Sequence, residues 1–175
     1  MLVTILGVLA LVLVVVVILA STRPNTFRIE RQATINAGAE KPFALIQDFH
    51  RWTEWSPWEQ LDPNMQRTHS GAPAGQGAIY QWKGSPKAGS GRMEILEATP
   101  SSRILIKLDF IAPFEAHNTA DFTLTSEGGS THVLWAMYGP QPFMNKLMSL
   151  FMNMDKLVGP DFEKGLAAMK RISEA

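Results

Sequence analysis

The sequence predicts an α+β domain preceded by a transmembrane helix. Three observations support this class. The first twenty residues carry no charged side chain, the middle of the chain alternates between apolar and polar residues, and the last part places apolar side chains at helical spacing. Because the strands follow one another instead of alternating with helices, the pattern favours α+β over α/β.

Residues 1–20 form the expected transmembrane anchor. They read MLVTILGVLALVLVVVVILA. A helix rises about 1.5 Å per residue, so this segment spans about 30 Å, the thickness of the hydrocarbon core of a bilayer. No face of the segment is polar, which argues against an amphipathic core helix.

A cleaved signal peptide is the main alternative for this segment. Such peptides have a basic n-region, an apolar core of about 7–15 residues and a small-x-small cleavage site. Here no Lys or Arg precedes the apolar run, the run is longer, and the bulky Ile18 lies two positions before Ala20. These features favour an uncleaved anchor.

The arginines near the anchor indicate its orientation. Arg23, Arg28 and Arg31 follow the span, and no Lys or Arg precedes it. The positive-inside rule then predicts a single-pass protein of the inner membrane with its domain on the cytoplasmic side. The chain has no cysteine, so disulfides give no information on the compartment.

Residues 21–25 form a short linker, and residues 26–175 form one domain large enough to bury a core. The chain has 16 basic and 16 acidic side chains, for a formal net charge of zero. A nucleic-acid-binding domain needs a basic face, so no nucleic acid partner is expected. Five Trp and nine Met provide rigid and adaptable apolar surfaces. The composition indicates no particular protein partner.

The domain begins with an alternating strand at residues 27–35 and a helix at residues 41–52. The helix has Pro42 in its first turn, where a missing N–H is harmless. An aromatic loop or short second helix is expected at residues 52–58. Six strand-like segments follow, separated by turns rich in Gly, Pro and Ser: residues 65–69, 78–83, 92–98, 103–110, 115–125 and 131–138.

Residues 142–173 are expected to form one long helix. Its middle contains Gly159 and Pro160, and a proline there removes a backbone hydrogen bond, so the sequence predicts a kink or break at this point. The antiparallel sheet must bury its apolar face, and this helix is the only large apolar element left to cover it. A cavity remains between the two wherever the facing side chains do not fill the space.

Three segments are distinctive: FALIQDFHRWTEWSPW at 43–58, GRMEILEATPSSRILIKLDF at 91–110 and FMNKLMSLFMNMDKLVGPDF at 143–162. Together with the element order, they resemble the SRPBCC superfamily, which includes START-type lipid-transfer domains, and look like its bacterial polyketide cyclase/dehydrase-like branch. The resemblance covers residues 26–175. It implies a helix-grip fold, a curved seven-stranded antiparallel sheet around a long C-terminal helix with an apolar ligand cavity. The superfamily shares no catalytic residues, so no reaction is implied.

Aromatic and methionine side chains are the candidate ligand-binding residues. Trp52, Trp55 and Trp58 follow the first helix, near one end of the implied cavity, where their rings either line a ligand entrance or plug the core. The other candidates lie on inward strand faces or opposite them on the last helix: Tyr80, Trp82, Phe110, Phe122, Trp135, Met144, Met148, Phe151 and Met152. Each of these types packs cores more often than it binds ligands, so the sequence leaves open whether the interior is hollow.

Candidates for catalysis are few. His50, Glu54 and Tyr80 are the weak candidates near the aromatic residues. None of the four histidines has metal-ligand spacing with another His, so no metal site is expected, and no motif indicates a cofactor. Asp109 and Glu115 flank a turn, but Asp109 should face solvent by alternation.

These observations lead to three functional hypotheses. The leading one is a membrane-tethered binding module for a small apolar ligand, such as a lipid, a quinone or a ring-containing metabolite. The second is a cyclase/dehydratase-like enzyme acting on a similar ligand, which requires an ionisable pocket residue with a shifted pKa. The third is a protein-interaction module with a vestigial cavity, which an exposed apolar patch elsewhere would favour.

Overall fold

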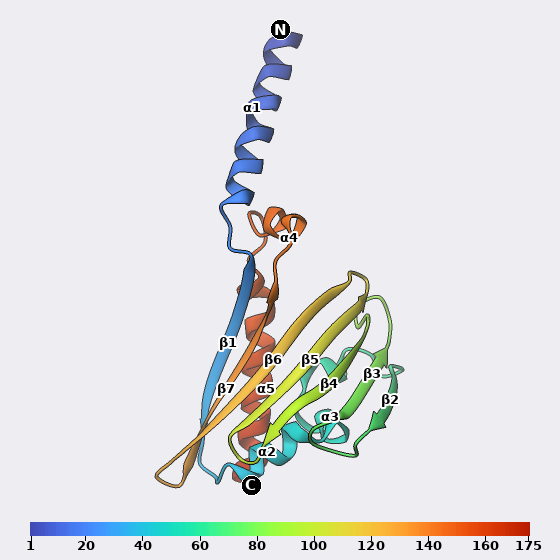
Figure 1. Cartoon of the computed structure of the whole chain (residues 1–175), viewed down its shortest axis with the longest axis vertical. Coiled ribbons are helices and arrows are strands. Elements are labelled where there is room, and N and C mark those ends of the chain that lie inside the picture. The colour runs from blue at the N-terminus through green and yellow to red at the C-terminus, as the bar shows by residue number, and fades with distance from the viewer.

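The computed structural model describes all 175 residues and separates one N-terminal helix from a body of sheet and helices (Figure 1). Helix α1 (Leu2–Ser21) extends away from that body, and it is apolar and long enough to cross a membrane. Seven strands form one antiparallel sheet in the order β1-β7-β6-β5-β4-β3-β2. The predicted α+β class, with an antiparallel sheet and a long C-terminal helix, is confirmed.

The first and last strands of the chain are neighbours in the sheet. Phe27 lies opposite Gly139 where β1 pairs with β7, and β1 and β2 form the two edges. The connection from β1 to β2 therefore crosses from one edge to the other, and hairpins join the remaining strands. The strand bounds are β1 Thr26–Ile35, β2 Gln66–Gly71, β3 Ala78–Lys83, β4 Ser90–Thr99, β5 Arg103–Ala112, β6 Ala116–Glu127 and β7 Ser130–Pro140.

The connection between β1 and β2 consists of short helices instead of the single helix expected at residues 41–52. Helix α2 ends before Asp48, whose backbone is extended and whose carboxylate accepts the N–H of His50 at 2.9 Å. Such a cap favours the start of a new helical turn, so the preceding helix α2 ends there. The pieces are α2 (Glu40–Gln47), the 3₁₀-helix η1 (Phe49–Arg51), α3 (Trp52–Trp55) and the 3₁₀-helix η2 (Pro57–Gln60).

The C-terminal region is two helices, α4 (Phe143–Met148) and α5 (Met154–Glu174). The break lies at residues 149–153, and Pro160 lies inside α5, so the expected position of the break is wrong. The side chain of Asn153 caps α5 by accepting the N–H of Lys156 at 3.2 Å. This cap starts a new helix. The helical spacing of apolar residues continues across the break and therefore gives no sign of it.

Helices cover the inner face of the sheet. Helix α5 packs along β1, and α2, α3 and η2 contact α5, while η1 contacts β3. Arg31 lies on the inward side of β1 between Ile29 and Ala33, although it is charged, because its guanidinium pairs with carboxylates of α5. The core joins the inner face of the sheet, the short helices and α5 into one cluster.

Candidate ligand-binding site

An aromatic stack fills the middle of the space between the sheet and α5. The Trp135 ring lies between those of Phe122 and Phe162, with centroids 4.9 and 4.1 Å away and interplanar angles of 26° and 12°. Trp55 meets Trp135 edge-on at 5.4 Å, and Trp52 lies 4.8 Å from Trp55. All five side chains are at most 4% exposed. They therefore form packed core, and Trp52 and Trp55 close the end of it.

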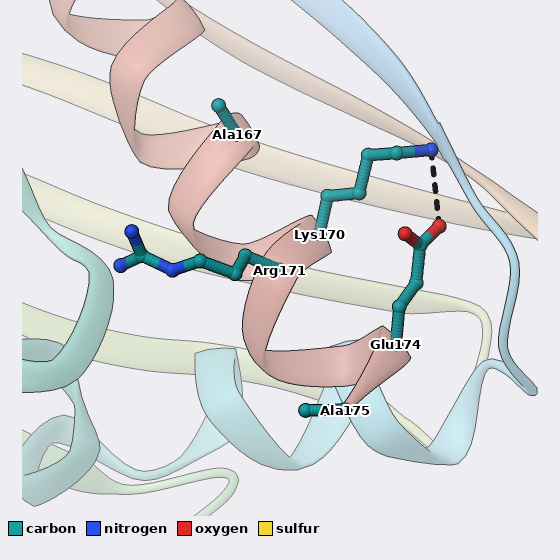
Figure 2. Close-up of a pocket in the computed structure, with 5 residues that line it drawn as sticks. All are labelled: Ala167, Lys170, Arg171, Glu174 and Ala175. Atoms are coloured by element: carbon teal, nitrogen blue, oxygen red, sulfur yellow. Dashed lines mark ion pairs between the residues drawn. The ribbon is translucent and has the colours of Figure 1, made fainter.

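The expected cavity is consequently filled along this part of α5. Two surface hollows lie elsewhere. Figure 2 shows one of about 410 Å³ on the last turns of α5, where Lys170 pairs with Glu174 at 3.0 Å. Its lining comes from a single helix and is largely charged, which does not suit an apolar ligand. The other hollow, of about 550 Å³, lies between α1 and the residues after α4.

The inner face changes character at the end of the sheet that faces α1 (Figure 1). Apolar side chains of the inner face are only partly buried at this end, whereas those in the middle of the sheet are buried. Phe27 is the second residue of β1, Trp82 and Phe110 lie near the ends of β3 and β5, and Val158 lies in the first turns of α5. With Trp58 of η2, these residues are called the open end: Phe27, Trp58, Trp82, Phe110 and Val158.

The strands carry small residues at the open end. Gly91 pairs with Phe110, Ala116 pairs with the other side of Phe110, and Gly139 pairs with Phe27. The Trp82 ring lies over Gly91, in space that a Cβ would take, and meets Phe110 edge-on at 5.8 Å. The small strand residues thus leave room for neighbouring side chains: the Trp82 ring lies over Gly91 and the Asn118 side chain lies over Gly139. The rings at the open end remain partly exposed, whereas mid-sheet positions carry the large buried rings.

A buried donor also lies near this region. The indole N–H of Trp135 has no hydrogen-bond partner within the protein, although Trp135 is almost completely buried. Buried indole N–H groups normally donate to an acceptor. This N–H is therefore left unsatisfied inside the packed core.

Three candidate residues of the last helix lie outside the interior. Met144, Met148 and Phe151 were expected opposite Tyr80 and Trp82, but they are exposed, by 62%, 44% and 76%, and so is Met152. This expected placement is wrong because the helix is broken: α5 alone lies under the sheet, while α4 contacts α1. Ile111, near the end of β5, and Phe114, in the turn that follows, are also exposed.

Tyr80 belongs to a separate buried polar cluster. Its hydroxyl donates to Glu59 at 2.6 Å, and Arg67 donates to the other carboxylate oxygen at 2.6 Å and to the Glu59 carbonyl at 3.0 Å. Burial, and then the bond to the Glu59 carboxylate, raise the pKa of Tyr80 well above its usual value. The same carboxylate raises the pKa of Arg67. Sequence reasoning missed Glu59 and Arg67, because their pairing depends on β2 passing η2 and leaves no periodic signal.

Two histidines extend this cluster to the surface. The rings of His50 and His69 stack at 4.0 Å, and the His69 ring lies 5.1 Å from that of Tyr80. Burial, and then the proximity of His50, lower the pKa of His69, whose Nε2 is buried without a hydrogen-bond partner. His50 itself is largely exposed and bonds Asp48 at 2.9 Å. Two candidate catalytic residues, His50 and Tyr80, are therefore joined through His69.

Glu54, the third candidate for catalysis, lies apart on the surface. It forms a two-point ion pair with Arg51 at 2.9 Å, and this bond lowers the pKa of Glu54. Asp109 lies on the outer side of the sheet, as expected from alternation, and pairs with Lys107 and His117. The structure contains no group of three His, Asp or Glu side chains arranged to hold a metal ion.

Comparisons with known proteins agree on the fold. A family model described as polyketide cyclase/dehydrase and lipid transport matches residues 26–174. No curated protein matches the chain. Major latex-like protein 151 of Panax ginseng is similar, with a TM-score of 0.62 at 10% identity over 87% of this chain and 100% of that one. A Chromobacterium violaceum protein gives a TM-score of 0.58 at 15% identity, covering 87% and 99%.

The di-domain ARO/CYC protein StfQ of the steffimycin biosynthetic pathway is also similar. Its TM-score is 0.62 at 10% identity, over 85% of this chain and 51% of that two-domain chain. Identities this low establish a common fold and leave substrate and reaction open.

Proposed function

Because the chain belongs to the family described as polyketide cyclase/dehydrase and lipid transport, we propose that it is a membrane-tethered module that binds a small apolar molecule. A lipid, a quinone or a ring-containing metabolite would suit it. In this proposal residues 1–20 are the anchor, residues 21–25 the linker and residues 26–175 the binding domain.

The open end is the observation that carries the proposal. Its rings are apolar and lie on the inner face of the sheet, yet they remain partly exposed, unlike those of the packed middle. Burying such apolar surface against a ligand contributes about 25 cal/mol of favourable free energy per Å² removed from water. We place the ligand against the exposed parts of the Trp58, Trp82 and Phe110 rings.

The aromatic stack plays a different part in this proposal. Trp52, Trp55, Phe122 and Trp135 form a rigid floor beneath the ligand, and Tyr80 stays within its polar cluster.

The tether supports the same function by partition. Apolar molecules concentrate in the bilayer, and the open end is the end of the domain that faces α1 (Figure 1). Arg23, Arg28 and Arg31 follow the span, which favours a cytoplasmic domain at the inner membrane. The intact mass of the protein purified from membranes distinguishes an anchor from a cleaved signal peptide.

Native mass spectrometry of the full chain, purified from membranes, tests the proposal. We expect a co-purifying apolar molecule that organic extraction removes. Trp82→Ala and Phe110→Ala should lose most of it, whereas His50→Ala, which changes an exposed ring away from the open end, should retain it. An empty wild-type protein in every preparation, or equal loss in all three variants, would refute binding at the open end.

A cyclase/dehydratase-like enzyme is the second candidate. The shifted pKa values of Tyr80 and His69 favour it, because such shifts are common at catalytic sites. The bonds among Tyr80, Glu59 and Arg67 are satisfied within the protein, however, which is typical of a structural cluster. Molecules extracted from wild type and from Tyr80→Phe that differ in mass by one water would favour the enzyme.

A further inference from the structure

Residues 143–154, called the α4 segment, form an apolar and exposed stretch. Eight of its twelve residues are apolar, and Lys146 is its only charged residue. Helix α4 buries none of its side chains. The exposed apolar residues of the segment are Phe143, Met144, Met148, Phe151, Met152 and Met154. An exposed apolar patch of this kind on a folded domain indicates a contact that the isolated domain does not satisfy.

The α4 segment is held beside the C-terminal end of α1. Lys146 Nζ donates to Asn25 Oδ1 at 2.5 Å, and the backbone N–H of Gln141 donates to the Asn25 carbonyl at 2.7 Å. Asn25 belongs to the linker that follows α1. Its two hydrogen bonds therefore hold Gln141, just before the α4 segment, and Lys146, within it, close to the end of α1. The hollow of about 550 Å³ lies between them, lined by Val16 and Leu19 of α1 and by Leu150 and Phe151.

The contacts with α1 fix the level of the segment relative to the anchor. Val16 lies five residues before Ser21, the last residue of α1, which corresponds to about 7.5 Å along the helix axis. Leu150 and Phe151 line the same hollow, so they lie level with the last turns of α1. The loop after α4 therefore lies beside the last turns of α1, at the same height along the axis of that helix.

This level agrees with the depth of an interfacial helix. The twenty residues of α1 just span a hydrocarbon core of about 30 Å, so its last turns lie in the outer part of that core. Helices that lie on membranes bury their apolar face about 5–10 Å into the boundary between headgroups and acyl chains. The overlap between α1 and the α4 segment falls within this range.

We infer that the α4 segment docks in the lipid–water interface beside α1 and that phospholipid fills the hollow between them. This inference rests on the proposed function only in requiring that α1 spans the membrane. Arg23, which also lines the hollow, is placed to meet lipid phosphate, while Phe151 and Leu150 meet the acyl chains. Docking at two places holds the open end at a fixed height and tilt over the bilayer.

A protein partner is the competing occupant of the α4 segment. The lipid surface is favoured because the apolar patch is continuous with the apolar side of α1 through the hollow. A partner on this patch would have to lie within the membrane beside α1. Exposed Met and Phe side chains alone would suit either a lipid surface or a protein partner. Their position beside the last turns of α1 favours the lipid surface.

The absence of cysteine makes the test direct. We would place single cysteines in the full chain with Met144→Cys, Phe151→Cys, Val12→Cys in α1 and Glu127→Cys at the end of β6. Each variant is labelled with NBD and reconstituted into phosphatidylcholine/phosphatidylglycerol vesicles. Quenching is measured with doxyl groups on shallow acyl-chain positions and with aqueous iodide. All four positions are exposed, so substitution should leave the fold intact.

We expect NBD at Phe151 and Met144 to be quenched by doxyl lipid and protected at least fivefold from iodide relative to Glu127. Val12 should be quenched by doxyl lipid alone, and Glu127 by iodide alone. If doxyl lipid quenches NBD at Val12 while iodide alone quenches NBD at Met144 and Phe151, interfacial docking is wrong and the tether stands. Protection of the α4 positions from both quenchers would show a protein contact and also overturn docking. Failure of lipid quenching at Val12 would overturn the tether itself.

Discussion

The guanidinium of Arg31 lies against α5 at Gly159, in space that a Cβ at this glycine would occupy. From there Arg31 donates to Asp155 at 2.8 Å and to Glu163 at 2.7 Å. One charged residue on the inward side of the edge strand thus joins β1 to the first turns of α5. The contact explains why glycine occupies the middle of a helix, where alanine is intrinsically favoured.

Gly159→Ala is expected to destabilise the protein by about 1–3 kcal/mol, because the new Cβ displaces the Arg31 side chain. Helix propensity alone predicts the opposite sign. The free energy of unfolding in urea, measured on the full chain in detergent micelles, tests this. In an Arg31→Ala background the same change should be neutral or stabilising. Destabilisation that persists in that background would show that the contact is not the cause.

The polar cluster around Glu59 should contribute to stability. Glu59→Gln removes the carboxylate that Arg67 and Tyr80 share, and it should lower the free energy of unfolding by about 2 kcal/mol, because the remaining groups lie in a poorly hydrated site. The control is Glu54→Gln, whose surface pair with Arg51 should be worth about 0–1 kcal/mol. Equal effects of the two changes would contradict the structural role of Glu59.

His69 should make the stability of the protein depend on pH. Its pKa is lowered from 6.5 in the fold, so the unfolded chain binds a proton more readily than the native protein does. Stability should therefore decrease as the pH falls below about 6.5. Asp48, His50 and Glu59 surround this group, so we compare the full pH profile of His69→Gln with that of wild type and of His132→Gln on the outer face. A wild-type slope in His69→Gln would exclude His69 as its origin.

Two tryptophans should differ in what they contribute. Trp135→Ala removes the centre of the aromatic stack and should cost about 3–5 kcal/mol of stability. Trp82 is partly exposed at the open end, so Trp82→Ala should cost less stability but release the co-purifying molecule. Thermal unfolding together with native mass spectrometry separates the two effects. A stable Trp135→Ala protein would mean that the stack does not hold the core.

Much of the fold could be predicted from the sequence. Alternation placed the strands, and the family match over residues 26–174 confirms the resemblance to the SRPBCC superfamily, whose helix-grip architecture the similar structures share. The helix breaks at Asp48 and before Asn153 were not predicted, because single capping residues outweighed continuous apolar periodicity there. Residues 143–152 were consequently assigned to the interior instead of to the surface beside α1.

The interior of the domain was harder to predict than its strands. Whether Trp135 lines a cavity depends on Phe122 and Phe162, which come from another strand and from α5. Ring stacking across three elements leaves no trace in local periodicity. The pairing of Glu59 with Arg67 and Tyr80 likewise depends on how β2 crosses η2. Positions such as Trp82 were correctly placed on the inward face, but their partial exposure followed only from the shape of the sheet.

The pairing of β1 with β7 joins the first strand of the domain to its last. Phe27 can pair only after Gly139, much later in the chain, has been synthesised. Until then β1 is an unpaired edge, so the sheet closes late and through long-range contacts. If α1 is held in a membrane as proposed, any pull on it runs lengthwise along β1 and loads the hydrogen bonds of the β1–β7 ladder in shear.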